Sequence, residues 1–225
     1  LALILDAAHM AGSRLHGRDA GQLADVACYS FQAVKNLPTA DSGMVCFADD
    51  ELDAAARKLS WLGISKDTYA RAALGTYAWM YDVDHVGYKY HGNSIMAGLG
   101  LVGLKYLDED NARRRQICES YEARLRGLGG IETVRTAPGC ESSRHLFQVL
   151  ADDRDGLMKA LHSRNIFGGV HYRINTDYPM YAHASGTCPR AESASASLLS
   201  LPLHLRLTDG EVDRVVGAVE DFAGG

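Results

Sequence analysis

The feature that most constrains the fold is a short apolar run that opens the chain and ends abruptly in an acid. Residues 1–5 read LALIL, and Asp6 follows directly. A continuous apolar run of this length is typical of a parallel strand that is buried on both faces. We therefore predict an α/β protein in which the carboxylate of Asp6 lies at the end of a buried strand.

The next elements follow the same α/β pattern. Two further strands are predicted over residues 26–31 and 43–48, and a helix that begins with the acids at 49–51 runs to residue 59. Acids are favoured at a helix N-terminus because they complement the helix dipole. Apolar residues at helical spacing then predict one long helix over residues 94–128. The glycines in it, Gly98, Gly100 and Gly103, weaken a helix, so we expect close packing there.

The C-terminal part restarts the α/β pattern. Strands are predicted over residues 145–150 and 166–172 on either side of a helix over 154–164, which makes a β-α-β unit. A helix over 189–199 follows, and Thr208 with Glu211 forms a capping box for a last helix to residue 222. We therefore expect residues 1–93 to be the remainder of a large domain, 94–130 a long connecting helix and 131–225 a small α/β domain.

Three side chains near the start point to one cofactor. Asp6 ends the first strand, Ser30 ends the second, and Lys35 follows five residues later in a mostly uncharged segment, FQAVKNLP. Pyridoxal phosphate (PLP) needs a lysine for its aldehyde, an acid for its pyridine nitrogen and hydroxyls or amides for its phosphate. Taken singly, the three have simpler interpretations as a strand-ending acid, a turn serine and a surface lysine. Their pairing and spacing favour a PLP site.

Composition narrows the class of partner. The 225 residues suffice for one large or two small domains, and the net charge of −5 with no basic run argues against nucleic acid or an anionic membrane. No apolar stretch approaches the ~18 residues of a membrane span. The five cysteines are scattered without a CxxC pair, so we expect no zinc site, no disulfide framework and a reducing, cytoplasmic location.

Several segments together carry a family resemblance. A resemblance to the DegT/DnrJ/EryC1/StrS sugar aminotransferases runs through residues 6–52. This range includes DAAH, CYSFQAVKN and the glycine before the third strand. These aminotransferases are PLP enzymes with the aspartate aminotransferase fold (fold type I). The segments GYKYHGNSIMAGLGLVGLKYLDE (87–109), GGVHY (168–172) and SLPLHLRLTDGEVDRVV (200–216) resemble the same family. The resemblance extends over almost the whole chain.

The resemblance implies roles for particular residues. Lys35 would be the catalytic lysine, which bonds to the cofactor and moves protons. Asp6 would pair with the pyridinium nitrogen, His9 would lie beside the cofactor ring, and Ser30 would bind the phosphate. Asn36 belongs to the same signature.

Further roles fall on later segments. The segment 89–93 would reach the cofactor phosphate of a partner subunit. His91 stands where many members have Asn or Arg, so Lys89, His91 and Asn93 all remain candidates for that contact. His171, with the neighbouring Tyr172, would lie near the sugar substrate.

The implied reaction moves an amino group, commonly from glutamate, onto a keto group of a nucleotide-linked sugar, in a homodimer with shared active sites. Some relatives have histidine in place of the lysine and are dehydratases, so Lys35 favours transamination. We expect the aromatic loop 61–90 and the segment 171–181 to select the sugar.

Three alternatives remain open. The chain could belong to another fold type I enzyme, such as a desulfurase, to a non-catalytic relative that binds cofactor or sugar, or to a degenerate fragment. Because the chain opens inside a strand, we expect it to be truncated at its N-terminus. We also expect residues 1–225 alone to form an incomplete cofactor site, to bind PLP poorly and to be inactive.

Overall fold

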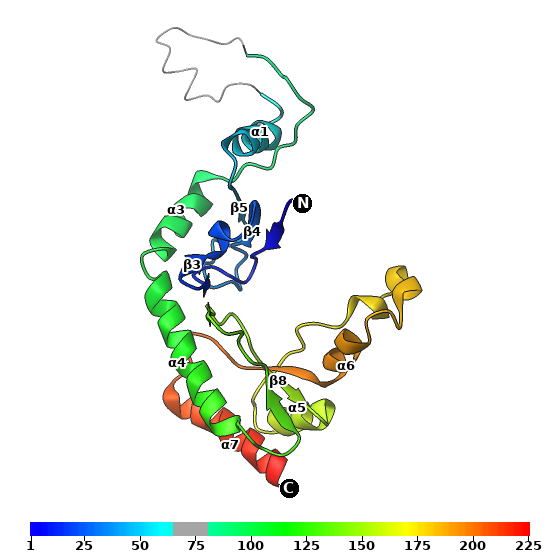
Figure 1. Ribbon diagram of the computed structural model, residues 1–225. Coiled ribbons are helices and arrows are strands. Elements are labelled where there is room, and N and C mark those ends of the chain that lie inside the picture. Colours follow the sequence, from blue (N-terminus) through cyan, green and yellow to red (C-terminus); the bar gives the residue numbers. More distant parts are fainter. Residues whose placement is uncertain (65–80) are drawn as a thin grey trace. The chain divides into compact units, whose positions relative to one another are not determined.

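The computed structural model describes residues 1–64 and 81–225 (Figure 1). The chain divides into two compact units, Leu1–Leu107 and Asp108–Gly225. The first contains Asp6 and Lys35, and the second contains His171.

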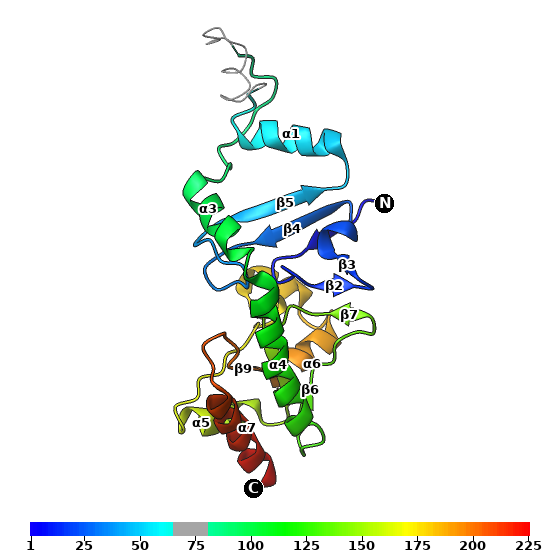
Figure 2. The ribbon, with the colours of Figure 1, turned by 90° about the vertical axis from the view of Figure 1, so that its left-hand side faces the viewer.

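A three-stranded sheet organises the first unit (Figure 2). Strand β1 (Ile4–Asp6) pairs in parallel with β4 (Val26–Ser30), and β4 pairs antiparallel with β5 (Gly43–Phe47). The predicted α/β class is confirmed, but this sheet is mixed rather than mostly parallel. The connection over residues 31–42 contains no helix, and a parallel pair needs a longer crossover that usually contains one.

The core of this sheet is small. Ala7, Ala20 and Ala27 form its buried apolar cluster. The prediction that residues 1–5 are buried on both faces is wrong, because Leu3 and Ile4 are 53% and 69% exposed. The apolar run therefore marked the strand correctly but not its burial.

Short elements connect β1 to β4. Strands β2 (Arg14–Leu15) and β3 (Arg18–Asp19) form a hairpin, whose turn places His16 and Gly17 at positive φ. Positive φ at both central residues is the geometry of a tight two-residue hairpin turn. A 3₁₀ turn, Ala20–Gln22, leads back to the sheet.

Helix α1 (Asp50–Ser60) follows β5, as predicted. Its N-cap is Asp49, whose Oδ1 accepts hydrogen bonds from the amides of Glu51 and Leu52 at 2.8 and 3.0 Å. The acids of the first turn then lie at the positive end of the helix dipole.

The helix predicted over 94–128 is two helices, α3 (Ser94–Gly103) and α4 (Leu107–Leu125). The expected close packing is found at two glycines of α3. A Cβ on Gly103 would lie 2.7 Å from Leu37 Cδ1, and one on Gly100 would lie 3.3 Å from Thr39 Cγ2. A Cβ on Gly98 would meet nothing within 4 Å, so the expectation is wrong there.

The second unit has an antiparallel sheet in the order β6 (Ile131–Thr133), β8 (Phe147–Ala151), β9 (Leu198–Leu201). Its other elements are β7 (Cys140–Glu141), α5 (Arg154–His162), α6 (Pro189–Ser197) and α7 (Asp209–Gly224). The predicted elements at β8, α5 and α7 are confirmed, and so is the Thr208–Glu211 capping box.

The predicted strand over 166–172 is wrong, and so is the β-α-β unit. Only Gly169 makes a bridge there, to Ser200 of β9. Residues 198–201, predicted as the end of a helix and its exit, form the strand instead. Glycines weaken a strand and suit a close backbone approach: a Cβ on Gly168 would lie 3.0 Å from Ser200 O.

A continuous apolar core fills the second unit. Helices α4 and α7 lie side by side (Figures 1 and 2), linked by ion pairs from Arg113 to Asp209 and from Arg124 to Asp213 and Glu220. Tyr121 of α4 donates a hydrogen bond from its hydroxyl to Pro202 O at 2.8 Å. The core includes Ile117, Tyr121, Leu125, Phe147, Val149, Leu157, Leu161, Leu199, Val216 and Val219.

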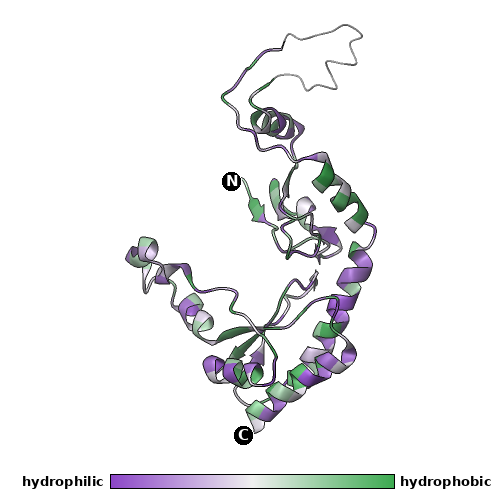
Figure 3. Cartoon of the chain, turned by 180° about the vertical axis from the view of Figure 1, so that it is seen from behind, coloured by the Kyte–Doolittle hydropathy of each residue, from purple (hydrophilic) through white to green (hydrophobic). Residues whose placement is uncertain are grey.

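Helix α3 contrasts with α4 in hydropathy (Figure 3). It is apolar on all sides, and its residues Ile95, Leu99 and Leu101 are at least half exposed. A helix that is apolar all round is usually covered. Among the helices of residues 1–64 and 81–225, none is both long and apolar enough to cross a membrane.

Candidate functional site

The carboxyl ends of β1 and β4 bring two predicted cofactor-binding residues to one edge of the sheet. The strands are parallel, with Asp6 in register with Cys28, and Ser30 ends β4 two residues later. Sites in α/β proteins form outside the carboxyl ends of parallel strands. Asp6 Oδ1 accepts a hydrogen bond from Ala8 N at 3.0 Å, which orients its carboxylate.

A direct contact joins the connections that follow these two strands. His9 Nε2 lies 2.7 Å from Lys35 Nζ, and both residues are half-buried. They are 26 positions apart in the sequence. Sequence reasoning named both residues but did not predict this bond.

The backbone around Lys35 is held by its neighbours. Thr39 donates from its amide and its hydroxyl to Phe31 O, at 2.8 and 3.3 Å. Asn36, Leu37 and Thr39 are buried, at 8%, 5% and 3% exposure. Thr39 was not singled out in the sequence, where a hydroxyl four residues after the lysine was its only signal.

Tyr29 precedes Ser30 on β4 and stays neutral. Burial is the main cause that raises the pKa of its phenol, and a hydrogen bond from the backbone of Gly21 partly offsets this. Successive strand residues point to opposite faces, so Tyr29 and Ser30 face different sides of the sheet.

The predicted phosphate-reaching residues gather around one tryptophan. The Trp61 ring meets the His91 ring edge-on at 4.1 Å, and Lys89 Nζ lies 5.7 Å from the Trp61 centroid. Asn93 instead caps α3, where its Oδ1 accepts from Met96 N at 3.0 Å. The geometry therefore groups Lys89 with His91 and uses Asn93 as a helix cap.

The predicted sugar-binding residues lie in the second unit. His171 Nδ1 is 2.9 Å from Ser200 Oγ, and the backbone oxygen of His171 accepts from Gln148 Nε2 at 2.7 Å. Tyr172 is 60% exposed, with its ring edge-on to that of His171 at 5.1 Å. Ser200 had no signal in the sequence as a partner of His171.

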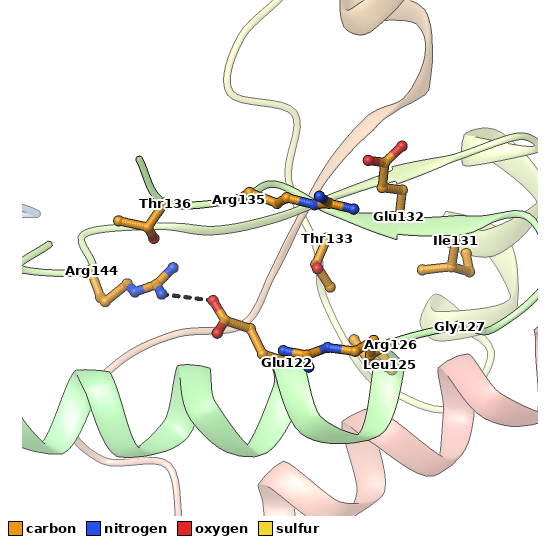
Figure 4. Close-up of a pocket in the computed structure, with 10 residues that line it drawn as sticks. All are labelled: Glu122, Leu125, Arg126, Gly127, Ile131, Glu132, Thr133, Arg135, Thr136 and Arg144. Carbon is orange, nitrogen blue, oxygen red and sulfur yellow. Dashed lines mark hydrogen bonds and ion pairs between the residues drawn. The ribbon is translucent and has the colours of Figure 1, made fainter. Parts of the chain in front are cut away.

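Among the hollows on the described surface of the second unit are two that contain no predicted site residue. The larger, of about 740 Å³, lies between α4 and β6 (Figure 4). Its half-buried Arg144 pairs with Glu122 at 2.6 Å. The smaller, of about 450 Å³, is lined partly by Arg173, Ile174 and Asp177. These three residues belong to the segment 171–181, to which sugar selection was assigned.

The other segment assigned to sugar selection is only partly visible. Tyr69, Tyr77 and Trp79 of the aromatic loop lie outside the described residues. Tyr88 and Tyr90 are described, and their rings stack at 5.2 Å.

A comparison with known families identifies the family of the chain. The model of the DegT/DnrJ/EryC1/StrS aminotransferase family matches residues 1–220. The chain belongs to this family. The predicted resemblance is confirmed.

Solved structures support the same assignment. TlmJ, an aminotransferase from Streptoalloteichus hindustanus, is 34% identical with a TM-score of 0.87, over 98% of this chain and 58% of TlmJ. Spr1654 from Streptococcus pneumoniae in its PMP form is 29% identical with a TM-score of 0.90, over 100% of this chain and 59% of Spr1654. Spr1654 was also solved in a PLP form, and PLP is the cofactor of the family.

A curated relative gives the same proportion of length. MJ1066 of Methanocaldococcus jannaschii is 30% identical in an alignment of 230 positions that covers 98% of this chain and 59% of MJ1066. The chain thus spans just under three fifths of the length of these relatives.

The residues at the sheet edge fit PLP by their chemistry. The cofactor presents an aldehyde, a pyridine nitrogen and a phosphate, and the edge offers an amine, a carboxylate and a hydroxyl. Lys35 is half-buried, and its amine already has a hydrogen-bond partner from the connection after β1. Lys35, Asp6 and Ser30 are therefore the residues that could hold the cofactor, while His9 contacts the lysine.

Proposed function

We propose that the protein containing this chain is a PLP-dependent aminotransferase that acts on a nucleotide-linked sugar. The amino donor is glutamate, and the acceptor is a keto group of the sugar. The observation that carries the proposal is the bond between His9 and Lys35, which joins the connections after β1 and β4, in a chain of this family.

The bound cofactor supplies an electron sink that allows a substrate to exchange its amino group. Lys35 Nζ is the amine that would bond to the cofactor and would move protons as an acid and base. The Asp6 carboxylate would pair with the pyridine nitrogen. The Ser30 hydroxyl would bind the phosphate.

The substrate side of the proposal rests on the second unit and on family membership. His171 is held by Ser200 and Gln148, so its ring is oriented before a substrate arrives. Tyr172 is exposed next to it and offers a ring face and a hydroxyl to a sugar. The segment that begins at His171 also lines the smaller hollow, so we assign sugar selection to it.

We also propose a homodimer with shared sites. Lys89 and His91 both lie against Trp61, with the His91 ring edge-on to it and Lys89 Nζ 5.7 Å from its centroid. In the proposed dimer they bind the cofactor phosphate of the partner subunit. A lysine or histidine suits this because hydrogen bonds to a charged phosphate are the stronger kind.

The test is transamination by the protein that contains this chain, measured as incorporation of nitrogen from labelled glutamate into a nucleotide-linked keto sugar. Lys35→Ala should lower the rate by about 10⁴-fold or more, because it removes the group that moves the proton. Lys159→Ala, an exposed lysine on α5, is the matched control and should leave the rate unchanged.

The same experiment separates the rival functions. Transfer of nitrogen only to keto acids would indicate an amino-acid transaminase instead. An effect in cells that survives Lys35→Ala would indicate a non-catalytic relative that binds cofactor or sugar. Either result would overturn the proposed function.

A further inference from the structure

The contact between His9 and Lys35 has a defined chemistry. A protonated lysine amine has three donors and no acceptor. In the 2.7 Å contact with Lys35 Nζ, His9 Nε2 is the acceptor in the tautomer that carries its proton on Nδ1. Family resemblance placed His9 beside the cofactor ring, whereas the structure directs its ring nitrogen to the lysine.

Lysine is a side chain for which such a partner matters. Its long flexible stem loses much rotamer freedom when it is held in one geometry. The backbone end of Lys35 is already held, because its own amide donates to Gln32 O at 2.9 Å and the following residues are buried. The bond to His9 holds the other end.

His9 is itself well placed to hold the amine. The turn after β1 is fixed by the bond from Ala8 N to Asp6 Oδ1 and by one from Met10 N to Ala7 O at 2.9 Å. Its ring therefore projects from a turn that also orients the Asp6 carboxylate. One short turn thus positions both the acid and the partner of the lysine.

We infer that His9 is a positioning residue that holds the Lys35 amine at the carboxyl ends of β1 and β4 before any cofactor binds. The inference rests on the proposed function, in which the lysine must react with an aldehyde. A lysine that is already held does not lose further conformational entropy when the aldehyde binds. The role needs only an acceptor atom at the position of Nε2.

Two variants isolate that atom. His9→Leu keeps an apolar bulk but removes the acceptor, and His9→Gln removes the ring but keeps an acceptor. The first readout uses the chain without cofactor and measures how fast the protons of Lys35 Nζ exchange with water. NMR detects this exchange in protein labelled at the lysine nitrogens, and the Lys35 signal is assigned by its loss in Lys35→Arg. Lys159, exposed on α5, is the internal reference.

We expect exchange at Lys35 to be about tenfold faster in His9→Leu than in the wild type, the effect of losing one hydrogen bond. His9→Gln should restore slow exchange, and Lys159 should not change. Equal exchange at Lys35 in the wild type and His9→Leu would overturn the inference, whether or not the protein is an aminotransferase.

The second readout uses the whole protein that contains this chain and compares two cofactor forms. PLP can bond to Lys35, whereas pyridoxamine phosphate has an amine in place of the aldehyde and cannot. His9→Leu should slow the appearance of the lysine-bound visible absorbance about tenfold and leave the affinity for pyridoxamine phosphate unchanged.

The pattern of failure separates the two proposals. An equal loss with both cofactor forms would place His9 at the cofactor rather than at the lysine and would overturn the inference. Uptake of neither form by the wild-type protein, with the NMR result as expected, would overturn the proposed function alone.

Discussion

Two leucines on helices show how differently the two units use apolar side chains. Leu157 on α5 is fully buried, whereas Leu101 on α3 is 66% exposed. In the second unit, side chains from α4, α5, α7 and the sheet meet in one core. In the described part of the first unit, the buried apolar residues are Ala7, Ala20, Ala27, Leu37 and Leu107.

The unit that carries Lys35 is thus the one with the smaller core. Apolar burial contributes roughly 25 cal/mol per Å², so a cluster of alanines contributes little. Order around the lysine comes instead from local bonds, such as those of Thr39 to Phe31 and of Lys35 to Gln32. Within residues 1–225, backbone hydrogen bonds order the segment around Lys35, whereas the larger apolar core lies in the second unit.

The sharpest test of this difference is one substitution made in both units. Leu157→Ala should lower the free energy of unfolding of the second unit by about 2–5 kcal/mol, because it leaves a cavity in the core. Leu101→Ala should change the free energy of unfolding of the first unit by less than about 0.5 kcal/mol. Urea unfolding followed by circular dichroism measures both, and equal effects would contradict the comparison.

A smaller effect is expected at a buried hydroxyl. Tyr121→Phe removes the donor to Pro202 O and leaves a part-buried carbonyl without that partner, at a cost of about 1–3 kcal/mol. Tyr106→Phe is the control, since Tyr106 is 55% exposed and should be neutral. Thermal unfolding compares the pair. A loss at Tyr106 as large as that at Tyr121 would mean that exposure does not separate the units.

Helix caps should show the contrast at about 1 kcal/mol. Thr208→Ala removes the N-cap of α7, which packs into the core, and should destabilise the second unit by that amount. Asn93→Ala removes the N-cap of α3 and should lower local protection without changing the stability of the second unit. Hydrogen exchange of the α3 and α7 amides distinguishes these outcomes. Faster exchange in α7 of the Asn93 variant would contradict the prediction.

The smallest expected effect is the loss of folding stability at acidic pH through Glu211. Hydrogen bonds from the amide and hydroxyl of Thr208 lower the pKa of Glu211 in the folded state. The unfolded state therefore takes up the proton first, so this contribution is complete above the ordinary glutamate pKa of about 4.3 and is lost as pH falls through the lower folded value. Unfolding midpoints against pH measure it. Glu211→Gln should flatten that part of the profile, and an unchanged slope would count against it.

Local signals predicted much of the fold. Asp49 and the Thr208–Glu211 pair marked helix starts, and apolar runs marked β4, β5 and β8, because caps and alternating burial act over a few residues. Non-local pairing was predicted poorly. The strand expected over 166–172 was displaced by β9, because strand partners are chosen by packing across the sheet rather than by propensity.

The candidate site shows the same difference between local features, which the sequence predicts, and non-local contacts, which it does not. The amino-acid sequence by itself determined the residue types, a carboxylate at Asp6, a hydroxyl at Ser30 and an amine at Lys35, together with the family to which they belong. Only the tertiary structure decided that His9 bonds to Lys35 and that Trp61 joins Lys89 to His91. Those contacts depend on strand register and on turns that bring distant positions together, and the spacing of residues along a chain does not specify either.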